Sequence, residues 1–180
     1  MTFADKLGAS YSQVRDQVKI KKIEVTVGSV TFNLRVRIPL KRETELMLER
    51  IAKPTPELVE KIYARLSSPL KESIAEGGED FLEVLNKDKQ IITVLDDDMI
   101  VDGNSVKQVA TFNAMWETKV EEFFHLLQSE SGEPIDETYE QISEEFPEPV
   151  IRQIVDDIES AIKPDYKTAK KNWGGLCVGK

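Results

Sequence analysis

The residues best suited to catalysis or metal binding are one histidine, His125, and one cysteine, Cys177. A zinc site or a catalytic triad needs several such side chains at matched spacing, and this chain offers no second histidine or cysteine. The single cysteine also excludes an internal disulfide. We therefore interpret His125 as a histidine on a helix surface or edge. We also predict that the protein has no catalytic residue, metal site or cofactor and is not an enzyme.

The acidic run at 96–98 is similar in composition to a calcium-binding loop, but its spacing does not fit one. If Asp98 held the first loop position, Ile100 and Val109 would fall at the third and twelfth positions, where an EF-hand needs oxygen ligands. We interpret the run as a solvated turn. The adjacent acids at 144–145 and 156–157 point apart on a helix, and the glycines near the C-terminus lack the rest of a phosphate loop.

A basic cluster is the exception in an acidic chain of net charge −9. Such a charge disfavours binding of nucleic acid, because phosphate backbones are repelled. The cluster could be a solvated sheet face that discourages edge pairing. It could also be a docking surface for an acidic partner, such as a second copy of the chain. We take as the candidate self-association surface the residues Lys22, Arg35, Arg37, Lys41 and Arg42.

The elements that position this cluster begin with a predicted β-hairpin over residues 19–38. Apolar and polar residues alternate on both sides of Gly28-Ser29, which suits a two-residue turn. That loop pairs Val27 with Val30, and further along it pairs Thr26 with Thr31 and Lys22 with Arg35. One face of the hairpin is then apolar. Because an isolated hairpin is marginal in water, we expect the helices that follow it to cover this face.

Helices are predicted over most of the remaining chain. The first runs from Lys41 to Ala52, and Thr55-Pro56 caps the next. Ser68-Pro69 indicates a fresh start and Gly77-Gly78 a stop. Residues 91–101 favour two short strands around the acidic turn. A capping box of Ser105 and Gln108 begins a long helix that extends to about Gln128. Shorter helices are expected over 136–145 and 149–162.

These elements predict an α+β fold, in which the N-terminal hairpin packs on a mainly helical body, with a second short hairpin near 91–101. We expect a mobile segment at 1–18, a core domain at 19–130, a helical C-terminal part of the same unit at 134–163, and a flexible tail at 164–180. The N-terminus lacks the apolar run of a signal peptide, and no stretch is long and apolar enough to span a membrane.

Three stretches in this order resemble the tail assembly chaperones of long-tailed bacteriophages. The first runs from Val30 to Glu43, a strand that leads into a charged helix. The second runs from Ile100 to Leu127 and contains Asn113-Ala-Met-Trp-Glu-Thr-Lys and Phe123-Phe-His-Leu-Leu. The third is Ile162-Lys-Pro-Asp-Tyr-Lys-Thr-Ala-Lys-Lys-Asn. The resemblance covers most of the chain from about Val30 to Asn172.

The resemblance implies a protein that acts in the host cytoplasm during tail building and is absent from the mature virion. Such chaperones bind the tape measure protein and help recruit tail tube protein. Many also exist in a longer form made by ribosomal frameshifting, and the terminal Gly179-Lys180 could be encoded by a slippery codon run. The expected partners are the tape measure protein, the longer form, tail tube protein and other copies of the chain. The alternatives are a structural virion protein and an adaptor unrelated to tails.

Overall fold

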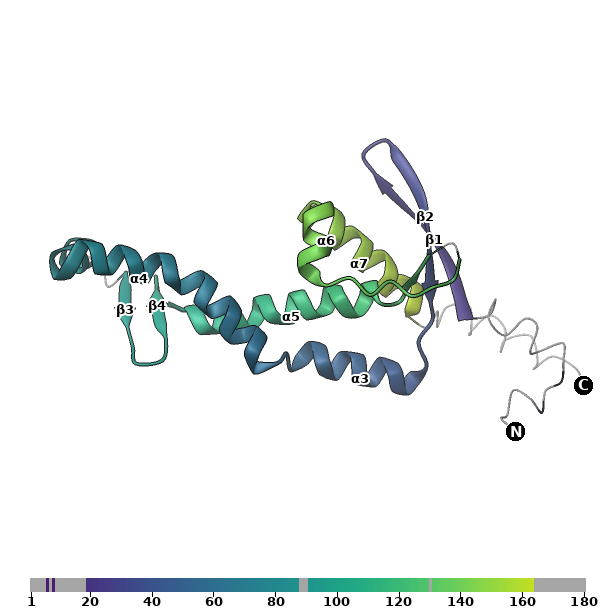
Figure 1. Ribbon diagram of the computed structural model, residues 1–180, viewed down its shortest axis with the longest axis horizontal. Coiled ribbons are helices and arrows are strands. Elements are labelled where there is room, and N and C mark those ends of the chain that lie inside the picture. Colours follow the sequence, from purple (N-terminus) through teal and green to yellow (C-terminus); the bar gives the residue numbers. More distant parts are fainter. Residues whose placement is uncertain (1–5, 7, 9–18, 88–90, 130, 164–180) are drawn as a thin grey trace, which may run out of the picture. The chain divides into compact units, whose positions relative to one another are not determined.

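The computed structural model describes residues 6, 8, 19–87, 91–129 and 131–163 (Figure 1). The predicted segments 1–18 and 164–180 lie almost wholly outside these residues. The fold class is α+β, as predicted, with antiparallel strands and a majority of helix. The chain forms two compact units, which we call the terminal unit (residues 1–40 and 123–180) and the central unit (residues 41–122). The expectation of a core domain at 19–130, with 134–163 as a helical part of the same unit, stays a prediction.

The predicted hairpin is confirmed in every pair of its register. Strands β1 (Ile20–Val27) and β2 (Val30–Arg37) are antiparallel, and Val27 pairs with Val30 and Lys22 with Arg35. Gly28 has the positive φ, 63°, that a primed turn needs at its first loop position. The hydroxyls of Thr26 and Thr31 lie 3.0 Å apart across the strands. Local alternation and the turn therefore suffice to fix this register.

The hairpin is covered by a helix that lies far along the sequence, which corrects our expectation that the next helices would cover it. Helix α7 (Glu148–Ile162) packs against β1. Five residues on one face of α7 are buried: Ile151, Ile154, Val155, Ile158 and Ala161. Helix α6 (Tyr139–Glu145) precedes α7 and contacts it. Among the described helices, α7 has a very regular apolar spacing, which predicts a helix but does not indicate which strand the helix covers.

A third strand, β6 (Leu127–Gln128), joins β2 on the side away from β1. The preceding helix, α5 (Val106–Phe124), therefore ends four residues earlier than predicted. Leu127 pairs with Val36, and the amide of Arg37 donates to the carbonyl of Leu126 at 2.7 Å. Leu126 and Leu127 are both buried, so pairing with β2 is more favourable than a further turn of helix.

The central unit contains α3 (Lys41–Ala52), α4 (Pro56–Asn86), most of α5 and a small antiparallel sheet, β3 (Ile92–Val94), β4 (Met99–Val101) and β5 (Asn104–Ser105). The first helix and the hairpin near 91–101 were predicted, whereas β5 was not. The buried core of the unit joins α4, this sheet and α5, and consists of Ile62, Tyr63, Ile92, Met99, Val106, Ala110 and Ala114.

Helix α4 continues through Ser68-Pro69, which we had predicted to begin a new helix. A proline inside a helix removes one hydrogen bond and costs about 3 kcal/mol. An apolar stripe with a spacing of four residues crosses this point and packs on the core: Leu58, Ile62, Leu66, Leu70 and Ile74. Burial of one such side chain contributes roughly 1.5–3 kcal/mol, so the stripe outweighs the proline. The predicted stop at Gly77-Gly78 appears as a kink, where Gly78 leaves the helical region at φ 64°.

A candidate protein-docking groove

An apolar groove of about 260 Å³ lies within the terminal unit. Eight of its lining residues are apolar: Phe32, Leu34, Phe124, Leu127, Ile135, Ile142, Phe146 and Ile154. The other three are Glu137, Gln141 and Glu145. Small-molecule pockets commonly have volumes of roughly 300–1,000 Å³. This groove is smaller, and it suits a few apolar side chains of a peptide or helix.

Each wall of the groove follows from a local feature of the sequence. Phe32 and Leu34 alternate along β2, so both side chains lie on its apolar face. The break between α5 and β6 places Phe124 and Leu127 nearby. Helix α6 is held by a capping box, in which the amide of Thr138 donates to Gln141 Oε1 at 2.9 Å. Proline at position 147 then ends α6 and begins α7.

The groove combines a buried floor with half-exposed walls and an acidic rim. Phe124, Leu127, Ile142 and Ile154 are buried, whereas Phe32, Leu34, Ile135 and Phe146 are only partly so. Glu137 and Glu145 are exposed among the lining residues. A ligand that placed apolar side chains in the groove and lysine or arginine beside them would therefore match both its hydrophobicity and its charge.

The predicted self-association surface is divided between the two units. Lys22 and Arg35 are cross-strand partners, and Arg37 follows on the same polar face of β2. Lys41 and Arg42 instead lie in the first turn of α3, in the central unit, where Lys41 forms an exposed ion pair with Glu45 at 3.9 Å. The prediction that this surface joins two copies stays a prediction.

The lone histidine lies in the turn directly after α5 and is half-exposed, which agrees with the interpretation of His125 as a histidine on a helix surface or edge. Its Nε2 is 3.3 Å from Asp136 Oδ1, and both side chains are substantially exposed. Within the described ranges, no three histidine, cysteine or acidic side chains are grouped so that they could hold a metal ion. Cys177 lies outside those ranges. In the same part of the chain, no helix has both the length and the hydrophobicity needed to cross a membrane.

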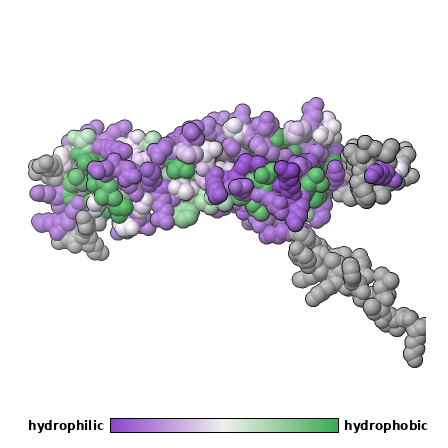
Figure 2. Space-filling view, turned by 90° about the horizontal axis from the view of Figure 1, so that it is seen from below, coloured by the Kyte–Doolittle hydropathy of each residue, from purple (hydrophilic) through white to green (hydrophobic). Residues whose placement is uncertain are grey.

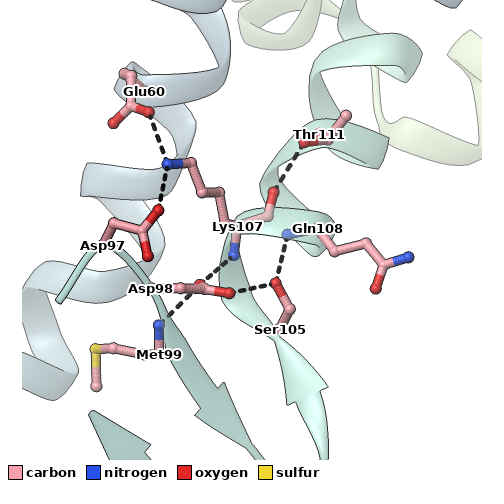
Figure 3. A network of polar contacts seen from close by, with 8 residues as sticks. All are labelled: Glu60, Asp97, Asp98, Met99, Ser105, Lys107, Gln108 and Thr111. Atoms are coloured by element: carbon pink, nitrogen blue, oxygen red, sulfur yellow. Dashed lines mark hydrogen bonds and ion pairs between the residues drawn. The ribbon is translucent and has the colours of Figure 1, made fainter. Parts of the chain in front are cut away.

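The acidic turn at 96–98 is only partly solvated, because Asp98 connects the small sheet to the start of α5 (Figure 3). Its carboxylate accepts hydrogen bonds from the amides of Met99 and Lys107, at 2.7 and 2.9 Å, and from Ser105 Oγ at 2.5 Å. Ser105 Oγ in turn accepts from the amide of Gln108, which confirms its predicted role as the N-cap of α5. The interpretation of a solvated turn therefore holds for Asp96 and Asp97, which are exposed, and is wrong for Asp98.

The pKa of Asp98 is lowered by this network. Partial burial alone would raise the pKa, but the hydrogen bonds from Ser105 Oγ and from the two amides, together with the charge of Lys107, outweigh it. Lys107 also reaches Asp97 and Glu60, at 3.7 and 3.6 Å, and so ties the turn to α4 (Figure 3). The Asp98 network thus ties the turn, the small sheet and the start of α5 together.

The central unit exposes apolar side chains of its own. Figure 2 shows hydrophobic atoms at the surface at the left of the view, where Figure 1 places α4, β3 and β4. Exposed members of this unit include Val94, Leu95, Val109 and Phe112. Leu95 and Phe112 line an open hollow of about 580 Å³ beside Asp98 and Lys107. This hollow mixes apolar, acidic and basic side chains, so its chemistry selects a partner less clearly than that of the groove.

Two features escaped the sequence analysis. The groove joins residues from four separate segments, and no local pattern marks that they meet. Glu117 is buried on α5 and binds Arg65 Nη2 of α4 at 2.8 Å. A glutamate within the apolar stripe of α5 is a signal of a buried ion pair, but it does not identify the partner. Comparisons with protein-family models, curated proteins and solved structures found no match to this chain.

Proposed function

We propose that this protein is a bacteriophage tail assembly chaperone and that the groove of the terminal unit holds a segment of the tape measure protein. The observation that carries the proposal is the groove, an apolar surface with an acidic rim on an otherwise charged protein. A chaperone needs such a surface to cover an aggregation-prone client, and it needs surrounding charge to keep the complex in solution. The resemblance of the sequence to tail assembly chaperones supports the identity of the client.

The groove suits an extended client because its half-exposed walls remain accessible. Ile135 and Phe146 flank α6, and Leu34 belongs to the neighbouring strand. A few apolar anchors provide most of the affinity in such contacts, and the rim provides orientation. Weak single contacts then add up when many chaperone molecules bind along one long client. The protein works by binding in this account, and no group is required to react.

Co-expression with the tape measure protein tests the function. We expect this chain to raise the soluble fraction of the tape measure protein and to be recovered with it as a complex. An unchanged soluble fraction, with no complex formed, would show that the function proposed here is wrong. Quantitative proteomics of purified virions tests the second part of the proposal. We expect the chain to be absent, and its presence at the level of structural subunits would favour a structural virion protein.

The variant Ile135→Asp tests the groove separately. Ile135 is half-buried in the segment before α6, and an aspartate there would place a charge among apolar anchors. We expect the affinity for the tape measure protein to fall by about tenfold or more. Val30→Asp is the matched control, because Val30 is 62% exposed in the same unit and does not line the groove. Equal losses in both variants would mean that the client binds elsewhere.

A further inference from the structure

The polar face of the sheet in the terminal unit carries a second hollow, of about 400 Å³. We call it the basic cup, and its lining consists of Lys19, Ile20, Arg35, Arg37, Gln128 and Gly132. Three of these six residues are cations. None of the described lining residues is acidic, although the whole chain has a net charge of −9. Among the residues that the structure describes, the lining of the basic cup thus has a charge opposite to that of the whole chain.

The strand register builds the basic cup. Ile20 pairs with Arg37 and Arg35 pairs with Gln128, so the four side chains share one face of the three-stranded sheet. Phe32 and Leu34 alternate with Arg35 along β2, so the apolar groove lies on the other face. A tight turn after β6, in which the amide of Gly132 donates to the carbonyl of Ser129 at 3.0 Å, completes the lining.

Gln128 adds a hydrogen-bond acceptor to the cup. Its side-chain oxygen, Oε1, is buried and has no hydrogen-bond partner within the described part of the chain. A buried acceptor without a donor costs about 1–3 kcal/mol. A ligand that brought an N–H group into the cup would remove this cost. The cup thus presents cations for negative groups and, among them, one acceptor for an N–H donor.

We propose that the basic cup binds an acidic peptide segment of a partner protein. Arginine guanidinium groups bind carboxylates through paired hydrogen bonds, and a peptide N–H would satisfy Gln128 Oε1. A nucleic acid backbone offers phosphates but no N–H donor, and the net charge of −9 on the whole chain would repel it. This proposal does not depend on the tail chaperone function, because the cup and the groove occupy opposite faces of the sheet.

Fluorescence anisotropy with the full chain tests the proposal. The probe is a labelled, end-blocked peptide of alternating glutamate and serine, and its counterpart has glutamine in place of every glutamate. We expect the glutamate peptide to bind at least about tenfold more tightly than the glutamine peptide at low salt. Equal binding of the two peptides would overturn the proposal.

Charge-matched variants show whether the cup is the site. Arg35→Gln with Arg37→Gln removes two cations from the cup, and Lys41→Gln with Arg42→Gln removes two exposed cations from α3. We expect the first pair to weaken binding of the glutamate peptide by about tenfold or more and the second by less than about twofold. Circular dichroism of both variants is the control for folding, and we expect the spectra of both to match that of the wild type. Equal losses would assign the effect to net charge and overturn the proposal.

Two further arms exclude other occupants. Gln128→Met keeps the size of the side chain and removes the acceptor, and we expect it to weaken binding of the glutamate peptide by about threefold or more. A labelled single-stranded oligonucleotide of equal charge is expected to bind more weakly than the peptide. Tighter binding of the oligonucleotide would overturn the proposal. Concentration-dependent self-association that the arginine variants abolish would also overturn it, because the occupant would then be a second copy of this chain.

Discussion

In each unit a charged side chain bonds to one end of a helix. The charge is negative in the central unit and positive in the terminal unit. In the central unit, Asp98 accepts hydrogen bonds at the N-terminal end of α5. In the terminal unit, Lys21 Nζ donates to the carbonyl of Ala161, at the C-terminal end of α7, at 2.8 Å. Each charge complements the dipole of its helix end. The Lys21 side chain is more exposed than that of Asp98, and it makes fewer hydrogen bonds.

This difference shows which interactions hold each helix. Asp98 is partly buried and accepts three hydrogen bonds, so it organises the sheet, the turn and the first residues of α5 together. Lys21 is exposed and makes one such bond. Helix α7 is held instead by its apolar face, and Gln153 adds a hydrogen bond to the carbonyl of Thr26. Charge should therefore matter more at the start of α5, and apolar burial should matter more along α7.

The largest expected effect comes from the apolar face of α7. Ile158 is fully buried, so Ile158→Ala removes apolar contacts and leaves a cavity. We expect the free energy of unfolding to fall by about 2–5 kcal/mol, measured by urea denaturation. Ile91→Ala is the control, because Ile91 is 36% exposed before β3 and should cost less than about 1 kcal/mol. Similar costs at both positions would contradict the role given to the face of α7.

The second effect concerns the anchor at α5. Asp98→Ala removes the acceptor of three hydrogen bonds, and we expect it to lower the free energy of unfolding by about 1–2 kcal/mol. Asp97→Ala is the matched control, since Asp97 is 84% exposed and its contact with the described residues is an ion pair with Lys107 at 3.7 Å. Its cost should stay below about 0.5 kcal/mol. If hydrogen exchange at the start of α5 were unchanged in Asp98→Ala, the anchoring role would be wrong.

The charge of Asp98 also predicts a dependence of stability on pH. Its pKa is lower in the folded chain than in the unfolded chain, so the carboxylate stabilises the fold at neutral pH. This contribution is lost as the pH falls below about 4, through the folded pKa. Asp98→Asn keeps the shape and removes the charge. We expect the difference in unfolding free energy between wild type and variant to be constant near neutral pH and to shrink in acid.

Sequence reasoning predicted those parts of the fold that depend on near neighbours. The hairpin register followed from one turn and two alternating strands, and the bounds of α3 and the N-cap at Thr55 followed from short patterns. It erred where distant segments compete for a residue. Leu127 has good helical spacing but pairs with Val36, and Pro69 is a helix-start signal that a buried stripe overrides.

The candidate sites were predicted only in part for the same reason. Arg35 and Arg37 were taken from their charge as part of a candidate self-association surface, and their strand places them in the lining of the basic cup. Gln128 could not be added, because its position beside Arg35 depends on a strand that the sequence pattern assigns to a helix. The groove needs α6, α7 and β2 together, and no pattern within one segment indicates that they meet.

The smallest expected effect is that of the contact between Lys21 and the C-terminal end of α7. Lys21→Met keeps the apolar stem and removes the charge that faces the carbonyl of Ala161. That carbonyl lies in the last turn of α7, where water can replace the lost donor, so we expect a cost of about 0.3–1 kcal/mol. The cost should decrease at high salt, because the residue that carries the charge, Lys21, is exposed. Lys22→Met is the control. If Lys21→Met lowered the free energy of unfolding as much as Asp98→Ala does, the charge of the exposed Lys21 would hold α7 as strongly as the partly buried Asp98 carboxylate holds α5.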